Sequence, residues 1–156
     1  MDLVQQQPNT TRRQLLVAGA GLVSVLLLRP AGATPESIEK AVRAFVGEAQ
    51  IRPGRVTLEA PPLVENGNSV PLMVSVESPM TASDYVKTIA IFNEKNPQPN
   101  VANFHLGPRA GQARVSTRVR LATSQQLLAV AAMSDGTFWS GSADVIVTLA
   151  ACLEEL

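Results

Sequence analysis

The sequence predicts a mainly β domain, an immunoglobulin-like antiparallel sandwich with one short N-terminal helix. From Arg55 onward, short runs rich in β-branched residues alternate with turn residues such as Pro, Gly and Asn. We count about seven such runs at a spacing of roughly 8–15 residues, which is typical of a sandwich. The 156 residues leave room for one compact domain. A barrel is the competing architecture, because periodicity alone does not separate the two.

A helix is expected at the start of the domain. Thr34-Pro35-Glu36 supplies a capping residue, a proline for the first helical position and an acidic residue for the first turn. One apolar face follows at helical spacing and comprises Ile38, Ala41, Val42, Phe45 and Val46. Gly47 is placed to end the helix. The pattern therefore predicts a short amphipathic helix that packs on the strands.

The strands are expected at residues 56–58, 70–76, 85–92, 101–105, 115–121, 127–133 and 138–149. Residues 115–121 alternate most clearly, with aliphatic side chains on one side and Ser or Arg on the other. One face of this strand is therefore expected in the core and the other in water. Ser134-Asp135-Gly136 predicts a hairpin turn between the last two strands.

The first 33 residues are predicted to be an export signal. Arg12 and Arg13 precede an apolar run over residues 14–28, and Ala31-Gly32-Ala33 is a small-residue cleavage site. The paired arginines are typical of the twin-arginine route, so the protein is expected in the periplasm. A retained membrane anchor is the alternative, but about 14 apolar residues fall short of the ~20 that a spanning helix needs. The predicted boundaries are 1–33 for the signal peptide, 34–149 for the sandwich and 150–156 for a C-terminal tail.

Charge and composition exclude several classes of function. Lys plus Arg and Asp plus Glu both number 13, so the net charge is zero and no basic field favours nucleic acid. A single cysteine, Cys152, excludes a disulfide framework and a cysteine-based zinc site. A single histidine, His105, argues against a multi-histidine metal site. We therefore predict no cofactor, no metal and no catalytic residue in the chain.

Two polar features remain as candidates for function. His105 ends a predicted strand, and a lone histidine there is interpreted as an edge residue with a hydrogen-bond partner rather than as a ligand or base. Arg114, Arg118 and Arg120 form either a basic stripe or an ordinary solvated face.

Two further pairs of residues lie near the end of the chain. Phe138 and Trp139, beside the predicted hairpin turn, serve either as a core anchor or as part of a partner-facing patch. Glu154 and Glu155 are adjacent in the tail and are interpreted as solvated rather than as a general acid and base.

Cys152 stands out because of its position in the tail, after the last predicted strand. An oxidising compartment tends to pair or modify a lone thiol. As a thiolate, an exposed cysteine is a nucleophile that can carry a covalent adduct from one enzyme to another. Position alone leaves two interpretations open, a reactive handle and an incidental cysteine.

Several segments together resemble one family. They are the twin-arginine signal, the helix after Thr34, the run from Val56 through Pro79, the strand 87–92 and the ending of residues 143–152. These are similar to SoxY, the periplasmic sulfur-carrier subunit of the thiosulfate-oxidising Sox system. The resemblance implies an immunoglobulin-like sandwich that pairs with a SoxZ-like sandwich protein as a heterodimer. It also implies that Cys152 is the covalent attachment site for sulfur intermediates, which other Sox enzymes attach, oxidise and hydrolyse.

The tail departs from the family pattern. The family arm reads Gly-Gly-Cys-Gly-Gly, whereas this chain has Ala150-Ala151-Cys152-Leu153-Glu154-Glu155-Leu156. Glycines give a thin arm many backbone conformations, and the two glutamates are expected to repel anionic thiosulfate or sulfite. The hypothesis is that Cys152 still carries sulfur but serves different partner enzymes, or serves the usual ones poorly. The alternative is a binding module that pairs with a SoxZ-like partner through an edge strand or an apolar sheet face and has lost the carrier arm.

Overall fold

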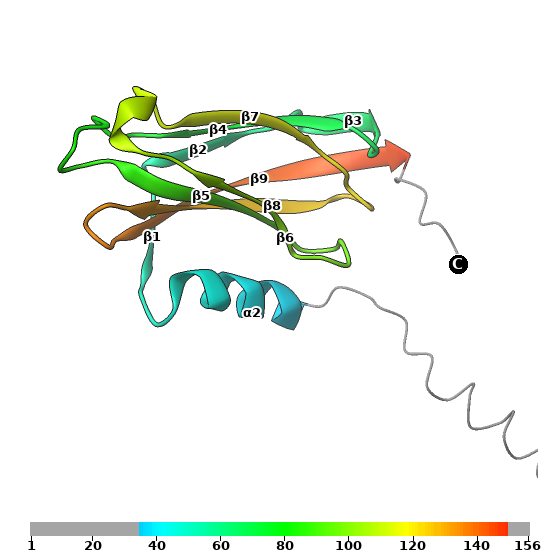
Figure 1. Cartoon of the computed structure of the whole chain (residues 1–156). Coiled ribbons are helices and arrows are strands. Elements are labelled where there is room, and N and C mark those ends of the chain that lie inside the picture. The colour runs from blue at the N-terminus through cyan, green and yellow to red at the C-terminus, as the bar shows by residue number, and fades with distance from the viewer. Residues whose placement is uncertain (1–34, 150–156) are drawn as a thin grey trace, which may run out of the picture. The chain divides into compact units, whose positions relative to one another are not determined.

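The computed structural model describes residues 35–149, which form one α-helix and two packed sheets. The elements are α2 (Pro35–Val46), β1 (Ile51–Pro53), β2 (Val56–Glu59), β3 (Leu63–Asn66), β4 (Val70–Val76), β5 (Val86–Asn93), β6 (Asn100–His105), the short 3-10 turn η1 (Pro108–Ala110), β7 (Arg114–Val119), β8 (Gln125–Met133) and β9 (Phe138–Leu149). Figure 1 shows the small sheet of β2, β4 and β7 above the large sheet, with α2 beneath. The predicted fold class, a mainly β sandwich with one short helix, is confirmed.

The large sheet is organised around β9. Its strand order is β1-β9-β8-β5-β6, and β3 also pairs with β9. The pairs between β9, β8, β5 and β6 are antiparallel, whereas β1 and β3 run parallel to β9. Both parallel partners use the edge of β9 that β8 leaves free. The small sheet is antiparallel, in the order β2-β4-β7.

The sequence prediction missed β1 and β3. These strands have three and four residues, and most of their side chains are exposed, so neither shows an apolar alternation. Their pairing with β9 joins segments far apart in the chain, which local patterns do not reveal. The seven predicted strands lie within two residues of their expected bounds.

The core between the sheets follows from alternation within the strands. In β4, four aliphatic residues are buried, and the residues between them are exposed or half-buried: the buried set is Val70, Leu72, Val74 and Val76. Residues of β5 and β8 face them from the large sheet, among them the fully buried Ile89, Ile91 and Leu127. This packing fixes the two sheets against each other.

Helix α2 covers the outer face of the large sheet with the predicted apolar positions. Ile38, Ala41, Val42, Phe45 and Val46 pack against a cluster that includes Phe92 and Val130. The ring of Phe45 lies 6.1 Å from that of Phe92 and 5.9 Å from that of Phe138, both edge-on. The helix ends as predicted at Gly47, which has a φ of 66° and donates its N–H to the Arg43 carbonyl at 2.8 Å. Within residues 35–149, no helix has the length and apolar character needed to cross a membrane.

The predicted turn at Ser134-Asp135-Gly136 joins β8 to β9. Met133 N–H donates to the Thr137 carbonyl at 2.9 Å, and Gly136 has a φ of 85°. Asp135 accepts hydrogen bonds from Thr137 N–H at 2.8 Å and from Thr137 Oγ1 at 2.7 Å. The backbone hydrogen bond from Thr137, followed by its hydroxyl, lowers the pKa of Asp135. The turn is therefore tied by its own side chains.

Gly141 of β9 lies close to the backbone of β2 in the small sheet. A Cβ placed on Gly141 would overlap the backbone carbonyl oxygen of Val56 at the start of β2. Backbone atoms cannot turn away as a side chain can, so only glycine fits at this crossing.

Gly141→Ala is therefore expected to lower the free energy of unfolding by about 1–3 kcal/mol, because a methyl group must be forced against backbone. Urea denaturation followed by circular dichroism measures this change. Gly107→Ala is the matched control, since its Cβ would meet open space and its φ is −138°. The control should change stability by less than about 0.5 kcal/mol. Equal stability of the two variants would contradict the close approach.

Candidate functional site

The residues to which the sequence analysis assigned function lie mainly outside the described part of the chain. Cys152, Glu154 and Glu155 belong to the predicted tail, and Arg12 and Arg13 to the predicted signal; all lie outside residues 35–149. The structure therefore defines the platform that precedes the tail, the end of β9.

The end of β9 is held on both sides. On the β8 side, Val147 N–H donates to Ser124 Oγ at 2.8 Å, and that hydroxyl donates back to the Val147 carbonyl at 3.3 Å. On the β3 side, Gly67 N–H donates to the Leu149 carbonyl at 3.0 Å. These bonds extend regular pairing to the last residue of the strand. The tail consequently begins from a fixed position.

Three large apolar side chains are exposed at this end of the sheet. Leu63 and Ile146 are each 57% exposed, and Leu149 is 68% exposed. Leu63 of β3 lies opposite Ile146 of β9, so these two side chains are neighbours on one face. Leu149 lies three residues after Ile146 and therefore points to the other face of β9, so we call Leu63 and Ile146 the apolar end patch. Exposed apolar patches commonly mark interaction sites.

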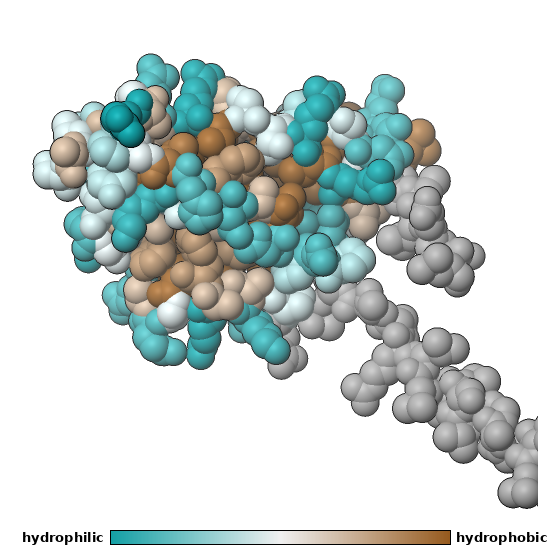
Figure 2. All heavy atoms as spheres, viewed as in Figure 1, coloured by the Kyte–Doolittle hydropathy of each residue, from teal (hydrophilic) through white to brown (hydrophobic). Residues whose placement is uncertain are grey.

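A second apolar surface lies along the open edge of the sandwich. β6 and β7 are the outer strands of their sheets, and Val101, Phe104 and Val115 are only partly buried there. Figure 2 shows hydrophobic residues along the edge between these layers, with hydrophilic residues around them. Both surface classes expected for a partner contact are thus present.

His105 lies at the end of β6, at the outer edge of the large sheet. Its Nδ1 is 3.1 Å from Thr88 Oγ1 on the neighbouring strand. Within residues 35–149 no cluster of His, Cys, Asp or Glu could hold a metal ion. The surroundings of His105 are those of an edge residue with a hydrogen-bond partner.

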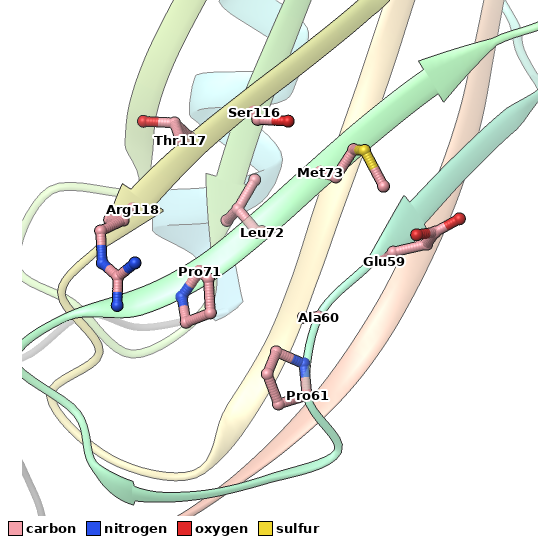
Figure 3. Close-up of a pocket in the computed structure, with 9 residues that line it drawn as sticks. All are labelled: Glu59, Ala60, Pro61, Pro71, Leu72, Met73, Ser116, Thr117 and Arg118. Carbon is pink, nitrogen blue, oxygen red and sulfur yellow. The ribbon is translucent and has the colours of Figure 1, made fainter.

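The three arginines predicted as a stripe divide between two places. Arg114 and Arg118 lie on the outer face of β7, where Arg118 Nε donates to Ser69 Oγ at 2.8 Å. Arg118 also lines an open groove of about 480 Å³ on this face, and Figure 3 shows it at the opposite end of the groove from Glu59. Arg120 follows the strand and lines a different cavity.

Phe138 and Trp139 point to opposite faces of β9. Phe138 points toward helix α2 and packs against Phe45. Trp139 packs against the core between the sheets, and the guanidinium carbons of Arg52 and Arg55 lie 5.7 and 5.4 Å from its ring centre. The structure therefore favours the core-anchor interpretation for both aromatic residues.

The sequence analysis missed a network of amides beneath the loop between β5 and β6. Asn93 and Gln125 are the two buried polar residues of the described chain, at 0% and 6% exposure. Gln125 donates from Nε2 to Asn96 Oδ1 at 2.9 Å and accepts from Lys95 N–H at 2.9 Å. Asn96 Nδ2 in turn donates to the Arg120 carbonyl at 2.7 Å. A signal was present in the sequence, since Asn93 directly follows one predicted apolar strand and Gln125 lies two residues before another.

Comparisons with known proteins identify relatives of this fold. The family profile described as sulfur oxidation protein SoxY matches residues 42–152. The solved structure of the sulfur carrier protein SoxY from Chlorobium limicola f thiosulfatophilum is 29% identical with a TM-score of 0.63, and the match covers 74% of this chain and 100% of that one. No curated protein matches the sequence.

Superoxide reductases share the fold at lower identity. The superoxide reductase (neelaredoxin) from Ignicoccus hospitalis is 19% identical with a TM-score of 0.54, over 75% of this chain and 95% of that one. The putative superoxide reductase from Thermotoga maritima is 21% identical with a TM-score of 0.52, over 63% and 87% of the two chains. At this identity the likeness extends to the fold alone.

Ser124→Ala is expected to loosen the end of β9. Loss of one such hydrogen bond costs about 1 kcal/mol, so amide exchange at Val147 should accelerate about fivefold. Hydrogen exchange followed by NMR measures this rate. Ser116→Ala, at an exposed position on β7, is the control and should leave the rate unchanged. An unchanged rate in Ser124→Ala would show that Ser124 does not hold the strand end.

Proposed function

Because this chain belongs to the SoxY family, we propose that it is a carrier of sulfur intermediates, with Cys152 as the residue to which sulfur is attached. One observation carries the proposal: the family match extends through the sandwich to residue 152. The Chlorobium structure, covered over its whole length, is that of a sulfur carrier protein. Cys152 is the only cysteine of the chain, so attachment through a thiol has a single position.

In this proposal the chain has two tasks: it holds the sulfur group covalently, and it presents that group to other enzymes. The Cys152 thiolate forms an S–S bond to the terminal sulfur of thiosulfate, and a separate electron-accepting enzyme takes up the two electrons that this bond formation releases. Other enzymes then act on the bound group. The sandwich contributes position, because β9 is bonded up to Leu149. Cys152 lies three residues further, so its Cα stays within about 11 Å of the Leu149 Cα even when the backbone is extended. The bound sulfur is thus presented beside the end of the sheet.

The altered tail favours a second candidate function. Ala150, Ala151, Leu153 and Glu154 stand where the family arm carries glycines. Each substitution adds a Cβ and reduces backbone freedom, and the glutamate adds negative charge. A tail of this kind enters a narrow enzyme channel less readily. The alternative is therefore a pairing module in which Cys152 carries nothing.

The apolar end patch supports a partner in either case. We propose that a SoxZ-like sandwich protein covers Leu63 and Ile146 to form a heterodimer. Large apolar side chains that are more than half exposed gain stability when a partner removes them from water. The patch adjoins the point where the tail begins, so a partner bound there would stand beside Cys152.

The proposed carrier works in the periplasm. Arg12 and Arg13 with the following apolar run support export by the twin-arginine route and cleavage near Ala33. Export of a folded domain is consistent with a protein that travels with a bound partner. N-terminal sequencing of the periplasmic protein identifies the cleavage site.

Intact mass spectrometry of the protein from thiosulfate-grown cells tests the carrier function. We expect sulfur-containing adducts that disappear with a thiol reductant and are absent from Cys152→Ser, because the thiol is the attachment point. A single unmodified mass in all samples would contradict the carrier function.

A glycine-restored tail separates the two candidate functions. This variant combines Ala150→Gly, Ala151→Gly, Leu153→Gly and Glu154→Gly. Adducts in the wild type and in this variant support the carrier. Adducts in the restored variant alone support the pairing module, because they show that the partner enzymes were present and the natural tail was not accepted.

Leu63→Asp combined with Ile146→Asp is expected to weaken binding of the SoxZ-like partner by at least about 100-fold, because both charges would be buried at the centre of the contact. Isothermal titration calorimetry with the purified partner measures the affinity. Thr57→Asp, at an exposed position on β2 in the other sheet, is the control and should bind normally. Unchanged affinity of the double variant would exclude the apolar end patch as the interface.

A further inference from the structure

The cavity beneath the β5–β6 loop is rich in hydrogen-bond donors. It has a volume of about 340 Å³ and is lined by four amide side chains and one cation: Asn93, Asn96, Gln98, Asn100 and Arg120. The two other lining residues are apolar, and no acidic residue among those described lines it. A site with this lining favours a negatively charged ligand.

Asn93 holds a buried donor without a partner. The residue is 0% exposed, and its Nδ2 is the one buried side-chain polar atom in residues 35–149 that lacks a hydrogen bond. Its Oδ1 accepts from Asn96 N–H at 3.3 Å, which sets the orientation of the carboxamide. A buried donor left unpaired is costly, so an acceptor from outside the described chain is expected here.

Strand alternation places Asn93 at the cavity, beside a β-bulge in β6. The register between β5 and β6 shifts between Ile91 and Phe92, where Val101 of β6 is the extra residue and lines the cavity, and Asn93 N–H continues the pairing with a bond to the Pro99 carbonyl at 2.9 Å. Phe92 packs on the helix side of the sheet, so alternation places Asn93 on the side of the core. Bulges often redirect side chains beside binding sites.

Arg120 supplies the positive charge. It is exposed, and within the described residues no ion pair engages it. Asn96 fixes the backbone around it, because Asn96 Nδ2 donates to the Arg120 carbonyl at 2.7 Å and Ala122 N–H donates to Asn96 Oδ1 at 3.0 Å. A guanidinium presents a planar fork of donors that matches the oxygens of an oxyanion.

The groove in Figure 3 lacks this combination. Arg118 is present there, but Glu59 lines the same groove, and no buried unpartnered donor among residues 35–149 faces it. The cavity under the β5–β6 loop is therefore the stronger candidate for an anion.

We propose that this cavity binds an oxyanion that accepts hydrogen bonds from Asn93 Nδ2 and from the guanidinium of Arg120. Two sources share this chemistry: a free tetrahedral sulfur oxyanion, of which sulfate is the simplest, and a carboxylate such as Glu154 or Glu155 of the tail. The site is independent of the thiol of Cys152. Whether or not an anion binds in this cavity, the carrier function is tested separately by the adducts on Cys152.

NMR titration of the mature protein with sulfate, thiosulfate and acetate tests the site. We expect the side-chain amide signal of Asn93 to shift on addition of a bound oxyanion, and Arg120→Gln to weaken binding by at least about tenfold through loss of the charge-assisted hydrogen bonds. Arg109→Gln, at an exposed arginine of η1, is the matched control and should leave the affinity unchanged. Arg120 is at the surface, so this test does not depend on changing the buried Asn93.

The same spectra distinguish the two sources. A shift with sulfate or thiosulfate but not acetate identifies a sulfur oxyanion. A change of the Asn93 signal in the ligand-free Glu154→Gln, Glu155→Gln variant identifies a carboxylate of the tail. A crystal structure soaked in selenate, an anomalous stand-in for sulfate, would show the anion against Nδ2. Two results would overturn the proposal. In the first, no anion shifts the Asn93 signal, the tail variant leaves that signal unchanged, and the crystal shows only water against Nδ2. In the second, Arg120→Gln binds the anion as tightly as the wild type does.

Discussion

Strand β9 is the element on which the other layers depend. Its twelve residues pair with β8 on one side and with β1 and then β3 on the other. Between those two parallel partners the chain crosses to the small sheet as β2, and the absence of a side chain at Gly141 leaves room for Val56. The same strand places Phe138 against helix α2 and Trp139 against the core between the sheets. A shift in its register would disturb both sheets and the helix together.

The described domain ends in a hydrogen-bonded strand, and the proposed attachment site lies in the tail beyond it. Hydrogen bonds from Ser124 and Gly67 hold β9 to its last residues, where the apolar end patch is also exposed. A carrier needs such a fixed base, because its partners must find both a docking surface and the reactive thiol within a short reach. Under the proposed carrier function, Leu153 and the two glutamates are expected to influence which partner enzymes accept the bound sulfur.

Local alternation made much of the fold predictable. β4 occupies its expected residues because apolar side chains recur at every second position. β1 and β3 are too short and too exposed to show such a pattern, and their pairing is decided by β9. The buried amide of Asn93 was missed because polarity was taken to end the strand. Cys152 stood out by its position in the tail, and the family resemblance implied its role, but it lies outside the described residues, so its surroundings do not follow from the fold.

The central claim is that sulfur is attached to Cys152 transiently during thiosulfate oxidation and is then released, so that the thiol is not permanently modified. A pulse of sulfur-34-labelled thiosulfate, followed by unlabelled thiosulfate, tests this in cells that express the wild-type protein or Cys152→Ser. The account predicts that label appears on the peptide containing Cys152, declines during the chase and is released as oxidised sulfur. Two results would contradict a carrier function. The label never reaches this peptide, or it stays on the peptide through the chase while thiosulfate is oxidised equally fast in cells with Cys152→Ser.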